Sequence, residues 1–219
     1  MTEDQNISIP QFFPVGVAQY FTKQRFGVED LLPQERLVAT DYGDKRLADF
    51  CTGRYCMRQS TSTLGFSGEI LIGNKGMPLL PEHITASLSH SRHLCGAVAA
   101  PKDQYLSVGM DIETKGRVHR DMWHLLFSAK EIEYLNLLDA EMQSLTTTIF
   151  FSAKEAFYKM QFPLTDTYLD FHDVEMDVHD GRYSARLLKD SGAFNCGHSF
   201  DTNFYKYGTE IITFCAQPA

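Results

Sequence analysis

Residues 105–113 read Tyr-Leu-Ser-Val-Gly-Met-Asp-Ile-Glu, and the rest of the chain is best understood outward from this stretch. Apolar residues take every second position, which is the period of a β-strand. The apolar residues therefore share one face of the strand, whereas Gly109, Asp111 and Glu113 share the other. Carboxylates two positions apart on one strand face lie roughly 6.5–7 Å apart at the backbone, so both can reach one cation. The stretch predicts a strand that carries an acidic site.

A second informative motif follows at residues 151–159, which read Phe-Ser-Ala-Lys-Glu-Ala-Phe-Tyr-Lys. Glu155 supplies a third carboxylate, with Lys154 beside it and Lys159 one turn further along the same helical face. Three carboxylates can hold a magnesium ion, and nearby ammonium groups can hold the phosphates that the ion bridges. The predicted metal ligands are Asp111, Glu113 and Glu155.

Simpler explanations exist for both motifs. Acidic residues that alternate along a strand usually form a solvated face, and the segment from Ser152 to Glu155 matches a helix capping box. Residues 127–131 contain the same pentapeptide, Phe-Ser-Ala-Lys-Glu, and lead into an amphipathic pattern typical of a capped helix. We therefore expect Glu131 to act only as a cap, worth about 0.5–2 kcal/mol. The second copy differs because it continues to Lys159 and is paired with the acidic strand.

Four segments in order resemble the 4'-phosphopantetheinyl transferase superfamily. Residues 109–113 and 151–159 are similar to its two signature motifs. Residues 73–78 followed by Leu-Ser-His-Ser at 88–91 resemble a further family segment. A basic stretch within 45–58 resembles a helix of the enterobactin synthase component D type. The resemblance covers residues 44 to 160, more than half of the chain.

Three positions depart from the family pattern. Phe151 stands where a tryptophan is usual, Leu80 where a tryptophan often precedes Pro81, and Met110 where a β-branched residue is usual. All three replacements are apolar, so they concern packing rather than chemistry.

The resemblance implies an α+β fold of two similar subdomains in a pseudo-twofold arrangement, monomeric, with coenzyme A in the cleft between them. Expected boundaries are 1–104 for the N-terminal subdomain, with contacts to the 3'-phosphate of coenzyme A, and 105–219 for the C-terminal subdomain with the magnesium site. The implied activity is Mg²⁺-dependent transfer of phosphopantetheine from coenzyme A to a serine of an apo carrier domain, with Mn²⁺ as an alternative metal. Adenosine 3',5'-bisphosphate is released.

The resemblance also implies roles for individual residues. Glu155, Lys159 and His90 are the expected catalytic residues, and Glu155 is one candidate for the general base. Residues expected to bind coenzyme A are Arg46, Arg54, Arg58, Lys75, Ser89, His90, Lys154 and Lys159. The resemblance to the component D type suggests carrier domains of non-ribosomal peptide synthetases in siderophore biosynthesis.

Composition narrows the classes of function. The chain has 219 residues and a formal net charge of −8, which disfavours nucleic acid as a partner. No apolar run is long enough to span a membrane. The N-terminus lacks the basic start of a signal peptide, and five cysteines without a Cys-x-x-Cys pair suggest reduced thiols. We expect a cytoplasmic protein.

The sequence also predicts how the elements are arranged. Apolar residues 97–100 and strand 105–113 suggest an antiparallel hairpin, and helices are expected to begin near Ser128 and Ser152. From about Tyr168 onward, three or four antiparallel strands are expected, with a tight turn at Asp180-Gly181.

Two other functions remain open on the sequence alone. A magnesium-dependent nucleotide phosphohydrolase would need the same carboxylates but no protein acceptor. A catalytically inactive homologue would only bind carrier domains.

Overall fold

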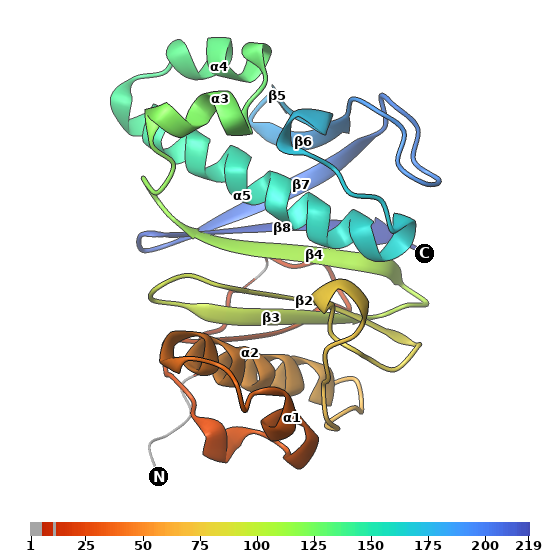
Figure 1. The fold of residues 1–219 in the computed structure, drawn as a ribbon. Helices are drawn as coiled ribbons and strands as arrows, with labels where there is room; N and C mark the ends of the chain where they lie inside the picture. Colours follow the sequence, from red (N-terminus) through yellow and green to blue (C-terminus); the bar gives the residue numbers. More distant parts are fainter. Residues whose placement is uncertain (1–5, 11) are drawn as a thin grey trace. The chain divides into compact units, whose positions relative to one another are not determined.

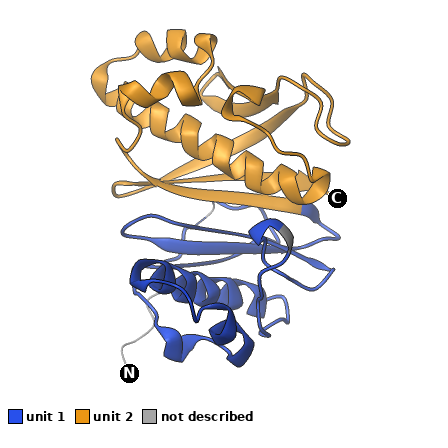
Figure 2. Cartoon of the chain, viewed as in Figure 1, with its two compact units in different colours: residues 1–106, 219 blue, residues 107–218 orange. Residues whose placement is uncertain are grey.

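The computed structural model describes residues 6–10 and 12–219, which form two compact units. Unit 1 comprises the chain up to Leu106 together with Ala219, and unit 2 comprises residues 107–218 (Figure 2). The division falls two residues beyond the expected boundary at 104. No helix in the described part of the chain is both long and apolar enough to cross a membrane.

Unit 1 combines a small antiparallel sheet with helices. Its strands follow the order β1-β3-β2, and helix α2 packs against all three of them (Figure 1). The elements are β1 (Ala18–Thr22), η1 (Val28–Asp30), α1 (Pro33–Val38), α2 (Asp44–Ser62), η2 (Asn74–Gly76), β2 (Ile84–His90) and β3 (Cys95–Pro101).

Unit 2 is built on a five-stranded sheet in the order β4-β8-β7-β6-β5, and the long helix α5 packs on its face. The helical elements are η3 (Arg120–Met122), α3 (Trp123–Leu126), α4 (Ala129–Asn136), α5 (Ala140–Thr165) and η4 (Phe171–Asp173). The strands are β4 (Tyr105–Thr114), β5 (Val174–His179), β6 (Arg182–Leu187), β7 (Ser199–Tyr207) and β8 (Glu210–Pro218). This mixture of helix and sheet agrees with the expected α+β class.

Several expected elements are confirmed. Four antiparallel strands follow residue 168, and the turn between β5 and β6 is made by Asp180 and Gly181. Both turn residues have positive φ, 51° and 75°, as a two-residue hairpin turn of this kind requires. Ser128 caps α4 and forms the predicted capping box with Glu131.

Two expectations about the elements were wrong. Residues 97–100 do not pair with 105–113, because β3 lies between β1 and β2 whereas β4 pairs with β8. The helix expected to start near Ser152 starts at Ala140 with Asp139 as its cap, so Ser152 lies inside α5. Polar residues such as Thr147 and Thr148 hid this earlier start, since their hydroxyls bond to helix carbonyls and remain buried.

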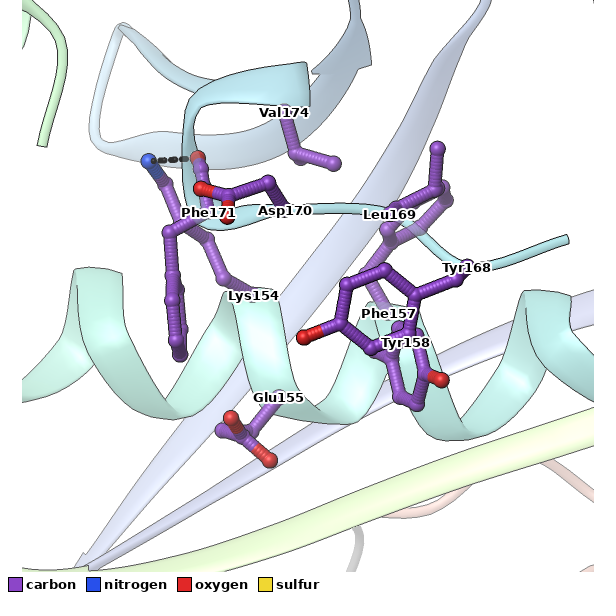
Figure 3. A pocket seen from close by; sticks show the side chains of 9 residues that line it. All are labelled: Lys154, Glu155, Phe157, Tyr158, Tyr168, Leu169, Asp170, Phe171 and Val174. Atoms are coloured by element: carbon purple, nitrogen blue, oxygen red, sulfur yellow. Dashed lines mark hydrogen bonds between the residues drawn. The ribbon is translucent and has the colours of Figure 1, made fainter. Parts of the chain in front are cut away.

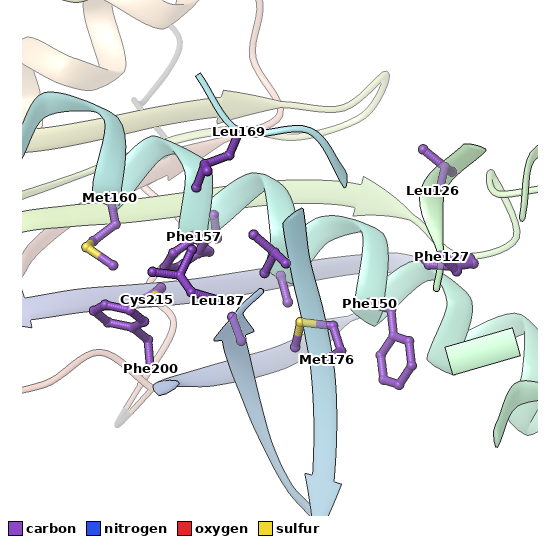
Figure 4. Packing of buried hydrophobic residues seen from close by; sticks show 14 of the residues in the cluster. Leu126, Phe127, Phe150, Phe157, Met160, Leu169, Met176, Leu187, Phe200 and Cys215 are labelled. Atoms are coloured by element: carbon purple, nitrogen blue, oxygen red, sulfur yellow. The ribbon is translucent and has the colours of Figure 1, made fainter. Parts of the chain in front are cut away.

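A buried apolar cluster holds α5 against the sheet of unit 2. Figure 4 shows Phe157 and Met160 of α5 together with Leu187, Phe200 and Cys215 of the strands. The rings of Phe157 and Phe200 lie 5.0 Å apart between their centroids. This packing explains why the apolar positions of the second motif are buried and therefore fixes which face of α5 turns away from the core.

Gly109 sets how closely α5 approaches β4. A Cβ atom at this position would lie 1.9 Å from the carbonyl oxygen of Ala156 and 2.7 Å from the amide nitrogen of Met160. Backbone atoms cannot rotate away as the end of a side chain can. The absence of a side chain at 109 therefore lets the middle of α5 lie directly on β4, beside Asp111.

We expect Gly109→Ala to push α5 away from β4 and to lower the free energy of unfolding by about 1–3 kcal/mol or more. Thermal unfolding followed by circular dichroism measures this. Gly43→Ala is the control for the clash, because a Cβ there meets nothing within 4 Å; it changes only the N-cap of α2 and should lose less stability than Gly109→Ala. Equal stability of the Gly109→Ala variant and the wild type would contradict the proposed tight contact.

Candidate functional site

The two acidic residues of β4 are buried. Asp111 is 4% exposed and Glu113 is 7% exposed, so their strand face is not solvated. Removing carboxylates from water is costly unless other groups compensate for the lost hydration. Two acidic residues buried on one strand therefore need nearby positive or hydrogen-bonding groups.

Helix α5 supplies these groups to Asp111. The hydroxyl of Ser152 donates to Asp111 Oδ2 at 2.9 Å, and Lys159 Nζ donates to Asp111 Oδ1 at 2.7 Å. Ser152, Glu155 and Lys159 are spaced three and four residues apart, which places them on one face of a helix. Because both ends of this face contact Asp111, Glu155 is turned toward the acidic strand.

Electrostatic coupling supports this proximity. Burial, and then the charge of Asp111, raise the pKa of Glu113 to about 7. The same two causes, in the same order, raise the pKa of Glu155. Lys159 and Arg117 act in the opposite direction on both groups. The carboxylates thus repel one another, as expected of acidic groups gathered where a cation can bind.

The fit of a metal ion is partial. In the described part of the chain, no three Asp, Glu, His or Cys side chains are grouped closely enough to make a ready metal site. Glu113 Oε2, however, is buried without a hydrogen bond from the described residues, although Arg117 Nη1 lies 3.1 Å away. Mg²⁺ is often bound by one or two carboxylates plus substrate phosphates. The acidic groups would supply only part of the ligand set of a magnesium ion, and a phosphate compound would supply the rest.

Lys154 lies on a different side of α5 from Glu155 and is 3% exposed. Its Nζ donates to Glu131 Oε2 at 2.8 Å and to the carbonyls of Leu126 and Phe171, both at 2.9 Å. Figure 3 shows Lys154 extending toward Phe171 while Glu155 points away from it. These three bonds use all three N–H groups of the ammonium. They make Lys154 a structural link from α5 to α3, α4 and η4.

The structural role of Glu131 is larger than the capping role that the sequence predicts. Besides capping α4, its carboxylate accepts from Met176 N at 2.7 Å and forms the buried ion pair with Lys154. Removing one partner of a buried pair costs about 3–5 kcal/mol, more than the loss of a cap. The first copy of the pentapeptide thus stabilises the helix that contains the second copy.

A small pocket adjoins Glu155 in unit 2. Its volume is about 150 Å³, and aromatic and apolar side chains form most of its wall (Figure 3). Residues that line it include Glu155, Phe157, Tyr158, Tyr168, Leu169 and Phe171. Tyr168 is 74% exposed, so the pocket is bordered by a ring that solvent can reach.

In unit 1, Arg54 is a buried cation with little compensation. It is 6% exposed and its guanidinium lies over the ring of Phe50, 4.5 Å from the centroid. Its Nε has no hydrogen-bond partner among the described residues. Burial lowers the pKa of Arg54, although nearby Glu35 opposes this. A buried guanidinium in this state would gain from an anionic ligand.

Arg58 has a different environment from Arg54. It forms an ion pair with Glu35, which is 0% exposed and also accepts from the amides of Leu32 and Ile70, both at 3.0 Å. Arg58 also donates to the carbonyl of Asp30. Arg58 therefore links α2 to α1 and η1.

The other predicted residues of unit 1 lie on exposed or edge positions. Arg46 is exposed on α2 and lies over the ring of Tyr42, 4.1 Å from the centroid. Lys75 is exposed in η2 with φ of 55°. Ser89 is buried near the end of β2, and His90 ends the strand with its Nδ1 3.9 Å from Asp49 Oδ1.

Several groups near the acidic strand are not indicated by the sequence pattern. Arg117 approaches Glu113 from the segment after β4. The sequence shows it only as a basic residue four positions after Glu113. The capping box suggested for Ser152 is wrong: the residue lies inside α5, and its hydroxyl contacts Asp111 and Thr213 Oγ1. Thr213 gave no signal, because it reaches the site from β8 at the far end of the chain.

Comparisons with known proteins identify the family of the chain. Residues 34–100 match the family described as "4'-phosphopantetheinyl transferase N-terminal domain", and residues 107–215 match the "4'-phosphopantetheinyl transferase superfamily". The chain is 33% identical to 4'-phosphopantetheinyl transferase Svp of Streptomyces mobaraensis, over 72% of this chain and 66% of that protein.

Two further relatives have names of the same kind. The chain is 31% identical to 4'-phosphopantetheinyl transferase PptT of Mycobacterium tuberculosis, over 75% of each chain. It is 26% identical to enterobactin synthase component D of Salmonella typhi, over 78% of this chain and 72% of that protein.

Glu113→Gln should make stability less dependent on pH. The folded chain keeps the Glu113 proton up to about pH 7, whereas an unfolded carboxyl with its ordinary value of 4.5 releases it earlier. Stability of the wild type therefore falls as pH rises through that window. A neutral amide avoids this loss, so the melting temperature of the variant should exceed that of the wild type at pH 8 but not at pH 5.

Glu141→Gln serves as the control for this pH series. Lys115 lowers the pKa of Glu141, which is the opposite direction, so this variant should gain nothing at pH 8. A difference between Glu113→Gln and wild type that stays constant from pH 5 to 8 would show that Glu113 is not the titrating group.

Proposed function

Since the chain belongs to the 4'-phosphopantetheinyl transferase superfamily and to that class of enzyme, we propose that unit 2 carries out Mg²⁺-dependent transfer of 4'-phosphopantetheine from coenzyme A to a serine of an apo carrier domain. Adenosine 3',5'-bisphosphate is the leaving product. The observation that supports this most directly is the contact of Ser152 and Lys159 with Asp111, which turns Glu155 toward the acidic strand.

Asp111, Glu113 and Glu155 are the proposed ligands of the metal. A bound Mg²⁺, or Mn²⁺ in its place, would neutralise charge on the pyrophosphate of coenzyme A. The buried oxygen of Glu113 and the mutual repulsion of the carboxylates favour a cation at this place. The phosphate oxygens of coenzyme A would supply the remaining ligands of such an ion.

Lys159 and Glu155 are the proposed catalytic side chains of α5. The serine oxygen attacks the β-phosphorus, the bond from that phosphorus to the oxygen of the leaving phosphate breaks, and Glu155 takes the serine proton. Burial and the charge of Asp111 raise the pKa of Glu155, whereas a bound cation would lower it, so we propose Glu155 as the base either directly or through a water. Lys159, 28% exposed at its side chain, binds the phosphates as they gain charge.

The pocket beside Glu155 suits the group that is transferred. Pantetheine is a long arm without charged groups, and the pocket wall is mostly aromatic and apolar. Tyr158 and Tyr168 add hydroxyl groups that can bond to its amides. We assign the pantetheine arm to this pocket.

In unit 1, Arg54 is the proposed partner of the 3'-phosphate of coenzyme A. Its buried guanidinium has a hydrogen-bonding atom that the described residues leave unused. Arg46, Lys75, Ser89 and His90 are proposed to contribute to the same ligand. Arg58 and Lys154 were also expected to bind coenzyme A. They form buried ion pairs with Glu35 and Glu131 instead, and we leave them out of the proposed site.

The proposed second substrate is a carrier domain of a non-ribosomal peptide synthetase in siderophore biosynthesis. The similarity to enterobactin synthase component D supports this choice. We further propose that the enzyme works in the cytoplasm as a monomer.

Mass spectrometry of an apo carrier domain incubated with the protein, coenzyme A and Mg²⁺ tests the function. Transfer adds the mass of phosphopantetheine to the carrier. Glu155→Gln should slow this gain by at least about 100-fold, because it removes both a base and a ligand. Glu141→Gln, on the same helix but with a side chain 77% exposed, should transfer at the wild-type rate.

The same assay separates the alternative functions. Cleavage of coenzyme A without a gain in carrier mass would indicate a phosphohydrolase, and a stable complex without either change would indicate a binding homologue. A panel of peptidyl, aryl and acyl carrier domains would show which class is preferred. Preference for a fatty-acid carrier would contradict the siderophore assignment alone.

Arg54→Ala should weaken binding of coenzyme A by about 1.5–3 kcal/mol, the worth of one hydrogen bond to a charged group. Wild type should discriminate against dephospho-coenzyme A by a similar amount, and the variant should discriminate little. Competition titrations with the two compounds measure both. A variant that still distinguishes them fully would remove Arg54 from the 3'-phosphate site.

A further inference from the structure

Two buried hydroxyl groups connect Asp111 to the rest of unit 2. Ser152 Oγ lies 2.9 Å from Asp111 Oδ2 and 2.8 Å from Thr213 Oγ1. Both Ser152 and Thr213 are 0% exposed. The three residues come from α5, β8 and β4, so the chain of contacts joins the helix to two neighbouring strands of the sheet.

The chemistry of the groups fixes the direction of the hydrogen bonds. A hydroxyl has one proton to donate, and the carboxylate of Asp111 accepts from Ser152 and from Lys159. Ser152 therefore donates its one hydrogen bond to Asp111 and must accept a hydrogen bond from Thr213. The bonds run from Thr213 to Ser152 to Asp111, and we call these three residues the hydroxyl relay.

The relay restrains one oxygen of Asp111 and leaves the other to the charged side of the site. A short acidic side chain has two torsions, and a single ion pair to the flexible Lys159 does not fix both of them. A second bond from a rigid helix, itself held by a strand, fixes the plane of the carboxylate. Groups that orient a metal ligand in this way typically change metal affinity or activity by about 10–100-fold when removed.

We propose that Ser152 and Thr213 are positioning residues of the transferase, which orient Asp111 so that its Oδ1 stays on the side of Lys159, where a metal and the phosphates would bind. The proposal rests on the proposed magnesium site. It assigns a role to the serine of the second pentapeptide and to a residue of the last strand, which has no polar motif around it.

Titration with Mn²⁺ in the presence of coenzyme A and without a carrier, followed by electron paramagnetic resonance, tests the proposal. Ser152→Ala and Thr213→Val should each weaken Mn²⁺ binding about 10-fold or more. Thr213→Ser keeps the donor hydroxyl and should bind close to the wild type. It also serves as the decisive comparison with Thr213→Val if Ser152→Ala proves too unstable to purify.

Thr147→Val is the matched control. Thr147 is 1% exposed on the same helix, but its hydroxyl bonds only to carbonyls of α5 among the contacts seen, at 2.9 Å and 3.2 Å. This variant should keep wild-type affinity for Mn²⁺, whatever its effect on melting temperature. An equal loss of Mn²⁺ binding in Thr147→Val would mean that general loss of packing, not orientation, is responsible.

The dependence of transfer on Mg²⁺ concentration supplies a second readout. The relay variants should need about 10-fold more Mg²⁺ for half-maximal rate and should recover much of the rate at saturation. A purely structural role would lower the melting temperature without shifting this requirement.

The outcomes separate the two proposals. Wild-type affinity in both Ser152→Ala and Thr213→Val would overturn the relay and leave the magnesium site standing. A wild-type protein that binds no Mn²⁺ with coenzyme A present would overturn the magnesium site, and the relay with it.

Discussion

The contact between the backbones of α5 and β4 at Gly109 is the constraint on which the site depends. A single methyl group at 109 would collide with the Ala156 carbonyl at 1.9 Å, and the helix would have to move outward. With the helix in place, Ser152 and Lys159 reach Asp111 at 2.9 Å and 2.7 Å. An outward shift of the helix by about 1 Å would take both contacts beyond hydrogen-bonding distance. The close packing of α5 on β4 is therefore a condition for the contacts that Ser152 and Lys159 make with Asp111.

The acidic site is unfavourable for the fold that contains it. Burial and mutual repulsion raise the pKa values of Glu113 and Glu155, so the folded protein holds their charged forms at a cost. A bound cation would remove that cost, which links ligand binding to stability. Two other buried charge pairs, Lys154 with Glu131 and Arg58 with Glu35, are compensated within the fold, whereas the buried Arg54 keeps a donor that the described residues leave unused. The contrast separates structural charges from those left available for a ligand.

The two copies of Phe-Ser-Ala-Lys-Glu show how position decides the role of identical residues. In the first copy, the serine caps α4 and the glutamate is buried as the partner of Lys154. In the second copy, the serine bonds to Asp111 and the glutamate lines a pocket. The lysine of the second copy pairs with the glutamate of the first. Each copy is therefore needed by the other, although only one lies beside the acidic strand.

Local sequence determined what depends on near neighbours: the alternation in β4, the Asp180-Gly181 turn, the capping box of α4 and the motifs that indicate the family. Tertiary structure decided which strands pair, that α5 begins at Ala140, and that Ser152 faces Asp111 rather than capping a helix. It also decided that Lys154 and Arg58 are structural while Arg54 keeps an unused donor. The reason is physical: periodicity reports which face a residue shares with its neighbours, but burial and ion pairing depend on distant segments that only packing brings together.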